Sequence, residues 1–421
     1  MYYGYKISDE TARLAEIAEE DCRPVFKKID ENALLCSAKV LNAFQESRVS
    51  TTDFIEVTGY GYTDDGRDKL ERVYAKVFGA EDALVRPQLM SGTHALAVTL
   101  FGLLKHGQTL VYISGEPYDT LRSVIGTAGQ SRNSLIKNGI KYEEIPLIGS
   151  EFDLEAIRKR FSEGFVKVAA IQRSRGYSQR KSLTIDQIAE AIRTVKEVSP
   201  DTVIMVDNCY GEFTEDREPT DVGADVFVGS MMKNLGAGFA LSGGYCVGRA
   251  DIIEDVAERL TAPCVGKSLG ANFNQLASFY KGFFMAPTTV AATLKSMVFA
   301  SRLLELCGYD SVSPKYDEKR TDIVQTVDFH SAEKLIKFCV GIQKGSPVEA
   351  YATPEPGEMP GYPHEEIMAA GTFVTGATNE LSCDGPVVEP FTAYMQGGLS
   401  YDYGKLGVMR AVDEMFDRAA D

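Results

Sequence analysis

Residues 202–208 have the sequence Thr-Val-Ile-Met-Val-Asp-Asn, and residues 225–234 have the sequence Asp-Val-Phe-Val-Gly-Ser-Met-Met-Lys-Asn. Each segment is a short apolar run that ends in polar residues, which is typical of a buried strand in a parallel sheet. In such sheets, ligands bind where loops leave the carboxyl ends of the strands. The two segments therefore predict a sheet with a site at its edge, and they place Asp207 and Lys233 at that site.

The same pattern recurs from about residue 80 to residue 250. Short apolar runs alternate with helical patterns, which indicates an α/β fold with a largely parallel sheet wrapped by helices. The expected strands are 83–89, 109–113, 166–171, 202–206, 225–228 and 243–247, and the expected helices are 93–104 and 185–198.

The rest of the chain predicts helices at the N-terminus and a smaller α+β unit at the C-terminus. Residues 8–50 have helical periodicity in two segments around Pro24, and residues 251–308 are mostly helical, including 288–306. Beyond residue 310 we expect strands at 323–329, near 372–376 and near 394–398, and helices at 332–343 and 403–420. The predicted division is a helical arm at 1–65, a large domain at 66–308 and a small domain at 309–421.

The composition of the chain indicates which partners and which cellular location are expected. The chain has 421 residues, is 44% hydrophobic and carries a net charge of −16, which argues against nucleic acid and anionic membranes as partners because both require a basic face. Its eight cysteines include no CxxC pair, the N-terminus lacks the pattern of a signal peptide, and no apolar run approaches the roughly 20 residues that span a bilayer. We therefore expect a cytoplasmic protein with reduced thiols.

Ser91-Gly92-Thr93 follows a predicted strand and begins a predicted helix. Gly92 allows the backbone to approach an anion closely, the two hydroxyl groups can donate hydrogen bonds, and the free N–H groups of the helix favour a phosphate. The alternative is an ordinary N-cap serine at the start of a helix.

Asp207 and Lys233 complete a possible cofactor site. A carboxylate at the end of a strand can pair with a protonated pyridinium nitrogen, although Asp207 could instead cap the following turn. Apolar neighbours are expected to desolvate Lys233 and lower its pKa, as imine formation requires, although a surface lysine with a buried stem is the alternative. Ser230 could add a phosphate contact. The order of these features, with Lys233 26 residues after Asp207 (233 − 207), predicts pyridoxal 5′-phosphate (PLP) bound to Lys233 as a Schiff base.

Several segments of the chain resemble the PLP-dependent Cys/Met-metabolism family of cystathionine lyases and methionine γ-lyase, and within it the aluminium-resistance branch. The resemblance covers nearly the whole chain and implies a fold-type-I transferase, with a mostly parallel seven-stranded sheet, helices on both faces and a smaller α+β C-terminal domain. The segments that carry it are 172–177 (QRSRGY), 207–212 (DNCYGE), 229–236 (GSMMKNLG), 380–386 (ELSCDGP) and 396–399 (QGGL).

The resemblance implies roles for individual residues. Lys233 would form the Schiff base, Asp207 would pair with the pyridinium nitrogen, and Tyr118 would stack on the cofactor ring and is a candidate acid or base. Contacts to the phosphate would come from Ser91, Gly92, Thr93 and Ser230.

The family also implies an assembled enzyme. A tyrosine before the first sheet strand reaches the phosphate of a neighbouring subunit in these lyases, and Tyr60 or Tyr62 lies in that region of this sequence. We therefore expect a homodimer or homotetramer with shared active sites.

The arginine that binds the substrate carboxylate in this family lacks its usual motif here, since residues 377–385 (ATNELSCDG) stand in its place. Arg173 and Arg320 are the candidates for a bidentate carboxylate clamp, and either could equally form a structural ion pair. Arg175 and Arg180 are the next candidates.

The predicted function is that of a PLP-dependent lyase that breaks a C–S bond in a sulfur-containing amino acid by β- or γ-elimination. One alternative is another PLP-dependent amino-acid enzyme, such as an aminotransferase or an aldolase. The other is a weakly catalytic protein of this fold that acts in stress or aluminium resistance. We expect no metal site, because the four histidines lack metal-ligand spacing and the pairs Asp64-Asp65 and Glu215-Asp216 have the pattern of solvated turns.

Overall fold

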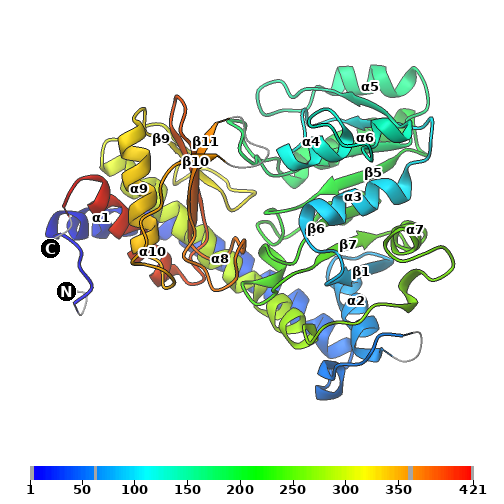
Figure 1. Cartoon of the computed structure of the whole chain (residues 1–421), viewed down its shortest axis with the longest axis horizontal. Coiled ribbons are helices and arrows are strands. Elements are labelled where there is room, and N and C mark those ends of the chain that lie inside the picture. Colours follow the sequence, from blue (N-terminus) through cyan, green and yellow to red (C-terminus); the bar gives the residue numbers. More distant parts are fainter. Residues whose placement is uncertain (1–3, 61–63, 359–363, 419–421) are drawn as a thin grey trace. The chain divides into compact units, whose positions relative to one another are not determined.

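The computed structural model describes residues 4–60, 64–358 and 364–418 (Figure 1). The chain divides into two compact units. The large unit comprises Leu35–Met285, and the small unit comprises Met1–Leu34 together with Ala286–Asp421.

The large unit is built on a seven-stranded sheet with the order β1-β7-β6-β5-β4-β2-β3. Strand β7 runs antiparallel to both of its neighbours, and the other neighbouring strands are parallel, which confirms the predicted mostly parallel sheet. The strands are β1 (Asp82–Arg86), β2 (Thr109–Tyr112), β3 (Lys141–Glu144), β4 (Val168–Gln172), β5 (Val203–Asp207), β6 (Val226–Ser230) and β7 (Gly244–Gly248).

Helices cover both faces of this sheet, as predicted. On one face, apolar side chains of α3, α4 and α7 share a buried cluster with Met205 and Val228. On the other face, Phe227 of β6 packs against Phe78 next to α2, at a ring distance of 5.1 Å. The helices of the large unit are α2 (Asp65–Val77), α3 (Gly92–Leu103), α4 (Asp119–Ile125), α5 (Leu154–Ser162), α6 (Ile185–Val198) and α7 (Ala250–Leu260).

The small unit has a six-stranded antiparallel sheet with the order β10-β11-β12-β13-β9-β8. The strand expected near 372–376 is wrong, because the carboxylate of Glu380 accepts the N–H groups of Phe373 and Val374 at 2.7 and 2.9 Å and holds a turn there. The elements are β8 (Val312–Ser313), β9 (Gln325–Asp328), β10 (Gly357–Glu358), β11 (Glu365–Ala369), β12 (Ser382–Pro386), β13 (Thr392–Gln396), α9 (Ala332–Lys344) and α10 (Tyr401–Met415).

Two long helices account for the difference between the predicted and the observed division. Helix α1 (Asp9–Glu46) is one helix that contains Pro24, and α8 (Leu276–Leu306) begins earlier than expected. Ala15 and Ala18 of α1 lie in the same buried cluster as Leu303 of α8. Because these parts of both helices pack into the core of the small unit, the boundaries fall within the helices and not at residues 65 and 308.

Helix α8 is also the single helix in the described ranges that is long and apolar enough to cross a membrane. However, 72% of its most apolar 18-residue window is buried within the protein, which is typical of a core helix.

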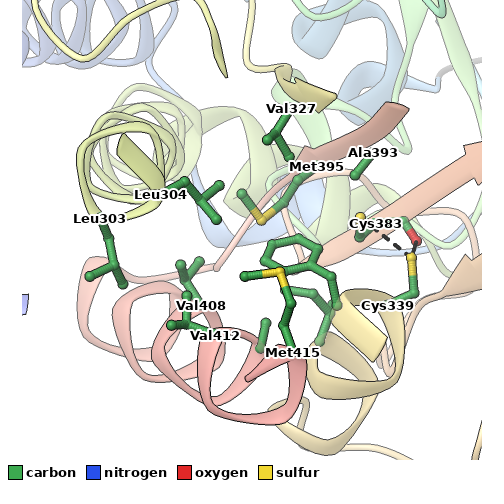
Figure 2. Close-up of a cluster of buried hydrophobic side chains, with 14 of the residues drawn as sticks. Leu303, Leu304, Val327, Cys339, Cys383, Ala393, Met395, Val408, Val412 and Met415 are labelled. Carbon is green, nitrogen blue, oxygen red and sulfur yellow. Dashed lines mark hydrogen bonds between the residues drawn. The ribbon is translucent and has the colours of Figure 1, made fainter. Parts of the chain in front are cut away.

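The core of the small unit is formed where α8, α9 and α10 cover one face of the antiparallel sheet (Figure 2). Met395 of β13 points into this cluster and is fully buried, whereas Met368 of β11 is 44% exposed. Cys339 of α9 and Cys383 of β12 lie in the same core as free thiols, with their sulfur atoms 3.8 Å apart.

The two methionines give a matched test of this core. We expect Met395→Ala to lower the free energy of unfolding by about 2–5 kcal/mol, because a buried methionine leaves a cavity. Met368→Ala should change it by no more than about 0.5 kcal/mol, because the side chain is half in solvent. Urea unfolding of both variants measures the difference, and equal losses would contradict the assigned core.

Candidate active site

The site lies at the edge of the large sheet where the parallel strands have their carboxyl ends. Asp207 is the last residue of β5 and Ser230 is the last residue of β6, while α3 begins at Gly92 beyond β1. A Cβ atom at Gly92 would lie 3.3 Å from Ser230 Cβ and 3.4 Å from Cys209 Sγ. The structure therefore brings the 91–93 turn, the segment after Asp207 and the start of the Lys233 loop together.

The start of α3 combines a helix cap with a close approach of the backbone. Ser91 Oγ accepts a hydrogen bond from His94 N at 3.1 Å, so the N-cap alternative is also true of this residue. Thr93 Oγ1 lies 2.6 Å from Thr120 Oγ1, and Ser230 Oγ accepts from Met232 N at 3.2 Å. Gly92 leaves the first N–H groups of the helix close to the end of β6, where an anion can bind.

Asp207 is a buried carboxyl group with a fixed orientation. Asp207 is 6% exposed, and its Oδ1 accepts a hydrogen bond from Cys209 N at 3.1 Å. Burial raises the pKa of Asp207, while the positive charge of Lys233 and the hydrogen bond from Cys209 act in the opposite direction. A nearby cation therefore stabilises the ionised form of Asp207.

Lys233 is surrounded by acidic groups, and its predicted low pKa is wrong. Its Nζ lies 3.9 Å from the centre of the Tyr210 ring. Burial lowers the pKa of Lys233, but Cys209, Tyr210, Asp207 and Tyr118 raise it, and the net shift is upward. The apolar neighbours of this lysine along the sequence predict a low pKa, whereas the fold adds acidic groups from neighbouring loops.

Close backbone contacts hold the turn that carries Lys233. A Cβ atom at Gly236 would lie 1.6 Å from the carbonyl oxygen of Met231, and one at Gly282 of α8 would lie 2.5 Å from the carbonyl oxygen of Gly236. Glycine is therefore required at both positions. The two glycines fix the loop of Lys233 against α8.

Tyr118 lines a cleft with a volume of about 360 Å³. Its N–H donates to Gln172 Oε1 at 2.6 Å, and its ring centre is 6.0 Å from that of Tyr177. Arg175 and Arg180 line the same cleft. Tyr118 is also one of the acidic groups that raise the pKa of Lys233.

Arg173 forms a structural ion pair, which is the second of the two roles that the sequence left open for it. The residue is fully buried, and its guanidinium lies 2.8 Å from Glu215 Oε2 and 3.4 Å from Glu218 Oε2. It also donates to Asn208 Oδ1 at 2.9 Å. These contacts fix residues 208–218, the segment that follows Asp207 in the chain.

Arg320 belongs to the small unit and is also bound within the protein. Its guanidinium donates to the carbonyl oxygen of Pro314 at 3.2 Å and to Gln325 Oε1 at 2.5 Å. These contacts correspond to the structural alternative for Arg320.

Each of the two expected solvated turns is wrong at one of its two residues, while Asp65 and Asp216 are exposed. Asp64 is buried and caps α2 by accepting from Arg67 N at 3.0 Å, and Glu215 is buried against Arg173. Across the described ranges, no group of three or more His, Cys, Asp and Glu side chains is placed to hold a metal ion.

Tyr60 is 73% exposed and forms an isolated bridge with Leu269. Tyr62 lies outside the described residues. The role of either tyrosine at a neighbouring subunit stays a prediction.

The sequence analysis missed three residues that surround Lys233. Cys209 and Tyr210 lie two and three positions after Asp207, and Glu212 is fully buried with its Oε1 accepting from the hydroxyl of Tyr245. One feature of the sequence could have identified Glu212. It is a second acidic residue five positions after Asp207, and residues 208–214 contain no other charge.

A family model described as Methionine gamma-lyase matches residues 11–416. The chain belongs to the methionine gamma-lyase family. This family member is 45% identical to a carbon-sulfur lyase involved in aluminum resistance from Clostridium novyi NT, with a TM-score of 0.93 over 97% of this chain and 96% of that chain. It is 46% identical over 402 residues to a Bacillus subtilis protein named "Uncharacterized protein YnbB", which covers 95% of each chain.

A distant structure shares the fold of this methionine gamma-lyase family member. Apo CalE6, a methionine gamma lyase from Micromonospora echinospora, is 18% identical, with a TM-score of 0.55 over 84% of this chain and 87% of that chain. The family resemblance and the predicted fold class are thereby confirmed, and both imply PLP as the cofactor.

The residues at the sheet edge fit this cofactor. Gly92 provides a cradle that a side chain would fill, and α3 provides N–H groups for a phosphate. Asp207 provides a buried carboxylate for a ring nitrogen, and Lys233 provides the amine.

The cradle at Gly92 leads to a prediction about cofactor affinity. Gly92→Val should weaken PLP binding by at least about tenfold, because the added side chain would fill the space between α3, Ser230 and Cys209. Gly164→Val is the control, since a Cβ atom there meets nothing within 4 Å. Equilibrium titration with PLP, followed by absorbance, measures both variants. Similar affinities in the two variants would contradict the placement of the phosphate.

The buried pair around Arg173 leads to a prediction about pH. Burial raises the pKa of Glu218 to about 7, although Arg173 opposes the shift. Between about pH 4.3, the ordinary pKa of glutamate, and the folded value, the folded state keeps a proton that the unfolded state has lost. This contribution to stability is therefore present at low pH and is lost as the pH rises through that window.

Glu218→Gln cannot lose the proton, so its free energy of unfolding should fall less than that of the wild type between pH 5 and pH 8. Urea unfolding at a series of pH values measures the two slopes. Equal slopes would show that Glu218 is already ionised at low pH.

Proposed function

We propose that this protein is a PLP-dependent carbon–sulfur lyase that acts on a sulfur-containing amino acid. The observation that carries the proposal is the convergence of Lys233, Asp207 and the Gly92 turn at one edge of the large sheet. Membership of the methionine gamma-lyase family supports the same reaction class and does not favour an aminotransferase, an aldolase or a weakly catalytic stress protein.

PLP, when bound, withdraws electrons from the α-carbon of an amino acid joined to it. Asp207 would pair with the pyridinium nitrogen of the cofactor, and the hydrogen bond from Cys209 N holds its carboxylate in place. The Nζ of Lys233 is the base that accepts the α-proton and can return a proton to the departing sulfur. Tyr118 would hold the ring by stacking on it and would supply a second acid or base.

The cleft beside Tyr118 is the proposed place for the substrate. Arg175 and Arg180 line it, so they are better candidates for the substrate carboxylate than Arg173 or Arg320. Arg180 also donates to the carbonyl oxygen of Gln172 at 2.8 Å, which fixes its position at the wall of the cleft.

We also infer a cytoplasmic homodimer or homotetramer with shared sites. The exposed side chain of Tyr60 and the exposed pair Leu34 and Leu35 on α1 support a surface that a second subunit covers. Light scattering on the purified protein distinguishes dimer, tetramer and monomer, and a monomer with full activity would contradict the shared site.

Lys233→Ala tests the proposed function directly. We expect the variant to lose the visible absorbance of bound PLP and to lose turnover, because it has no amine at the sheet edge. Lys281→Ala is the matched control, because that exposed lysine lies on α8 with its Nζ 4.7 Å from the Phe239 ring. Release of thiol, keto acid and ammonia from L-cystathionine, L-methionine and L-cysteine measures turnover. A Lys233→Ala variant that keeps both signals would contradict the proposal.

A further inference from the structure

Glu212 is a buried carboxyl group in the 208–218 segment, which contacts the loop that carries Lys233. It is fully buried, and its carbonyl oxygen accepts a hydrogen bond from Asn234 Nδ2 at 3.0 Å. Asn234 is the residue next to Lys233, so this bond ties the two loops together. Glu212 and Lys233 also interact electrostatically.

The two oxygens of this carboxyl group have different surroundings. Oε1 accepts a hydrogen bond from the hydroxyl of Tyr245, while Oε2 has no hydrogen-bond partner within residues 4–60, 64–358 and 364–418. Gly229 makes room for the pair, because a Cβ atom there would lie 2.2 Å from the Tyr245 hydroxyl oxygen. A buried carboxyl oxygen without a partner destabilises a fold, so a structural role alone does not explain this residue.

We propose that Glu212 is a positioning residue that acts through Lys233. Its ionised carboxylate stabilises the positive charge on the lysine nitrogen and thereby sets the pH at which that nitrogen gives up its proton. This inference rests on the proposed function, because it assigns the second carboxyl group to the lysine while Asp207 serves the pyridinium nitrogen.

The groups around Glu212 are consistent with this role. Burial raises the pKa of Glu212 to about 8; the hydrogen bond from Tyr245 and the charge of Lys233 oppose the shift, and Glu218 adds to it. Tyr245 from β7 and Tyr74 from α2 face the carboxyl group, and burial raises the pKa of both well above the usual value for tyrosine. Both tyrosines therefore stay neutral where Glu212 changes charge.

Two further titratable groups, Cys209 and Glu218, interact with Glu212. Burial raises the pKa of Cys209 well above the usual value for a thiol, so Cys209 is neutral over the pH range in which Glu212 changes charge and acts on Lys233 only above that range. Burial raises the pKa of Glu218 to about 7, and its carboxyl group is held by Arg173 and Asn208. Glu212 is therefore the acidic side chain in this set that can change the charge near Lys233 above pH 7.

The test is a pH titration of the visible absorbance of Lys233-bound PLP in the wild type, Glu212→Gln and Tyr245→Phe. Glu212→Gln has nearly the same shape but cannot carry the charge, so the pH midpoint should fall by about one unit. Tyr245→Phe keeps the carboxyl group but removes its donor, which raises the pKa of Glu212. Its midpoint should therefore lie between those of the wild type and Glu212→Gln.

The double variant Glu212→Gln with Tyr245→Phe should shift no further than Glu212→Gln alone, because Tyr245 acts through the carboxyl group. Thermal unfolding of each variant separates this effect from a loss of fold. A folded Glu212→Gln variant with the wild-type midpoint would overturn the proposal. If Glu212→Gln does not fold, a wild-type midpoint in Tyr245→Phe would overturn it.

A second readout separates this inference from the proposed function. In the cofactor-free protein, the pH dependence of acetylation at Lys233, measured by peptide mass spectrometry, should move to lower pH in Glu212→Gln. If the wild type binds no PLP but this shift is found, the proposed function fails and the Glu212–Lys233 coupling stands. If PLP binds and neither readout shifts, the coupling fails and the proposed function stands.

Discussion

The candidate site depends on an ammonium group and a carboxylate that stabilise each other at the carboxyl edge of the large sheet. Lys233 and Asp207 each have a pKa that burial alone would shift toward the neutral form, and each is stabilised by the charge of the other. The surrounding structure holds Lys233 and Asp207 in position. The parallel strands β5 and β6 bring the two residues to the same edge, and the contact between Gly236 and Gly282 fixes the loop of the lysine.

The same constraint explains the buried polar residues of the 208–218 segment. Arg173 binds Glu215 and Glu218, and so it anchors a loop that carries Cys209 and Tyr210, two of the groups that act on Lys233. Tyr210 adopts a left-handed backbone conformation, with φ of 71°, and places its ring below the lysine nitrogen. A loop held this firmly can keep strained and charged residues in one arrangement, as pre-organised sites require.

Much of the fold and the centre of the site could be predicted from the sequence, because they depend on local pattern. The apolar runs that end at Asp207 and Ser230 mark buried strands, and Gly92 marks a close backbone approach at a helix start. Features set by distant contacts could not be predicted. Arg173 has the chemistry of a carboxylate clamp, and only the three-dimensional arrangement shows that its carboxylates are Glu215 and Glu218. The raised pKa of Lys233 and the division of the chain within α1 and α8 likewise depend on neighbours far away in the sequence.

The central claim is that the amine of residue 233 holds the cofactor covalently. Reduction of the purified protein with borohydride, followed by digestion and mass spectrometry of the peptides, tests this claim most directly. The account predicts a pyridoxyl phosphate group on the peptide that contains Lys233 and on no other lysine. A label on a different lysine, or an unlabelled Lys233 peptide from protein that was saturated with PLP, would contradict it.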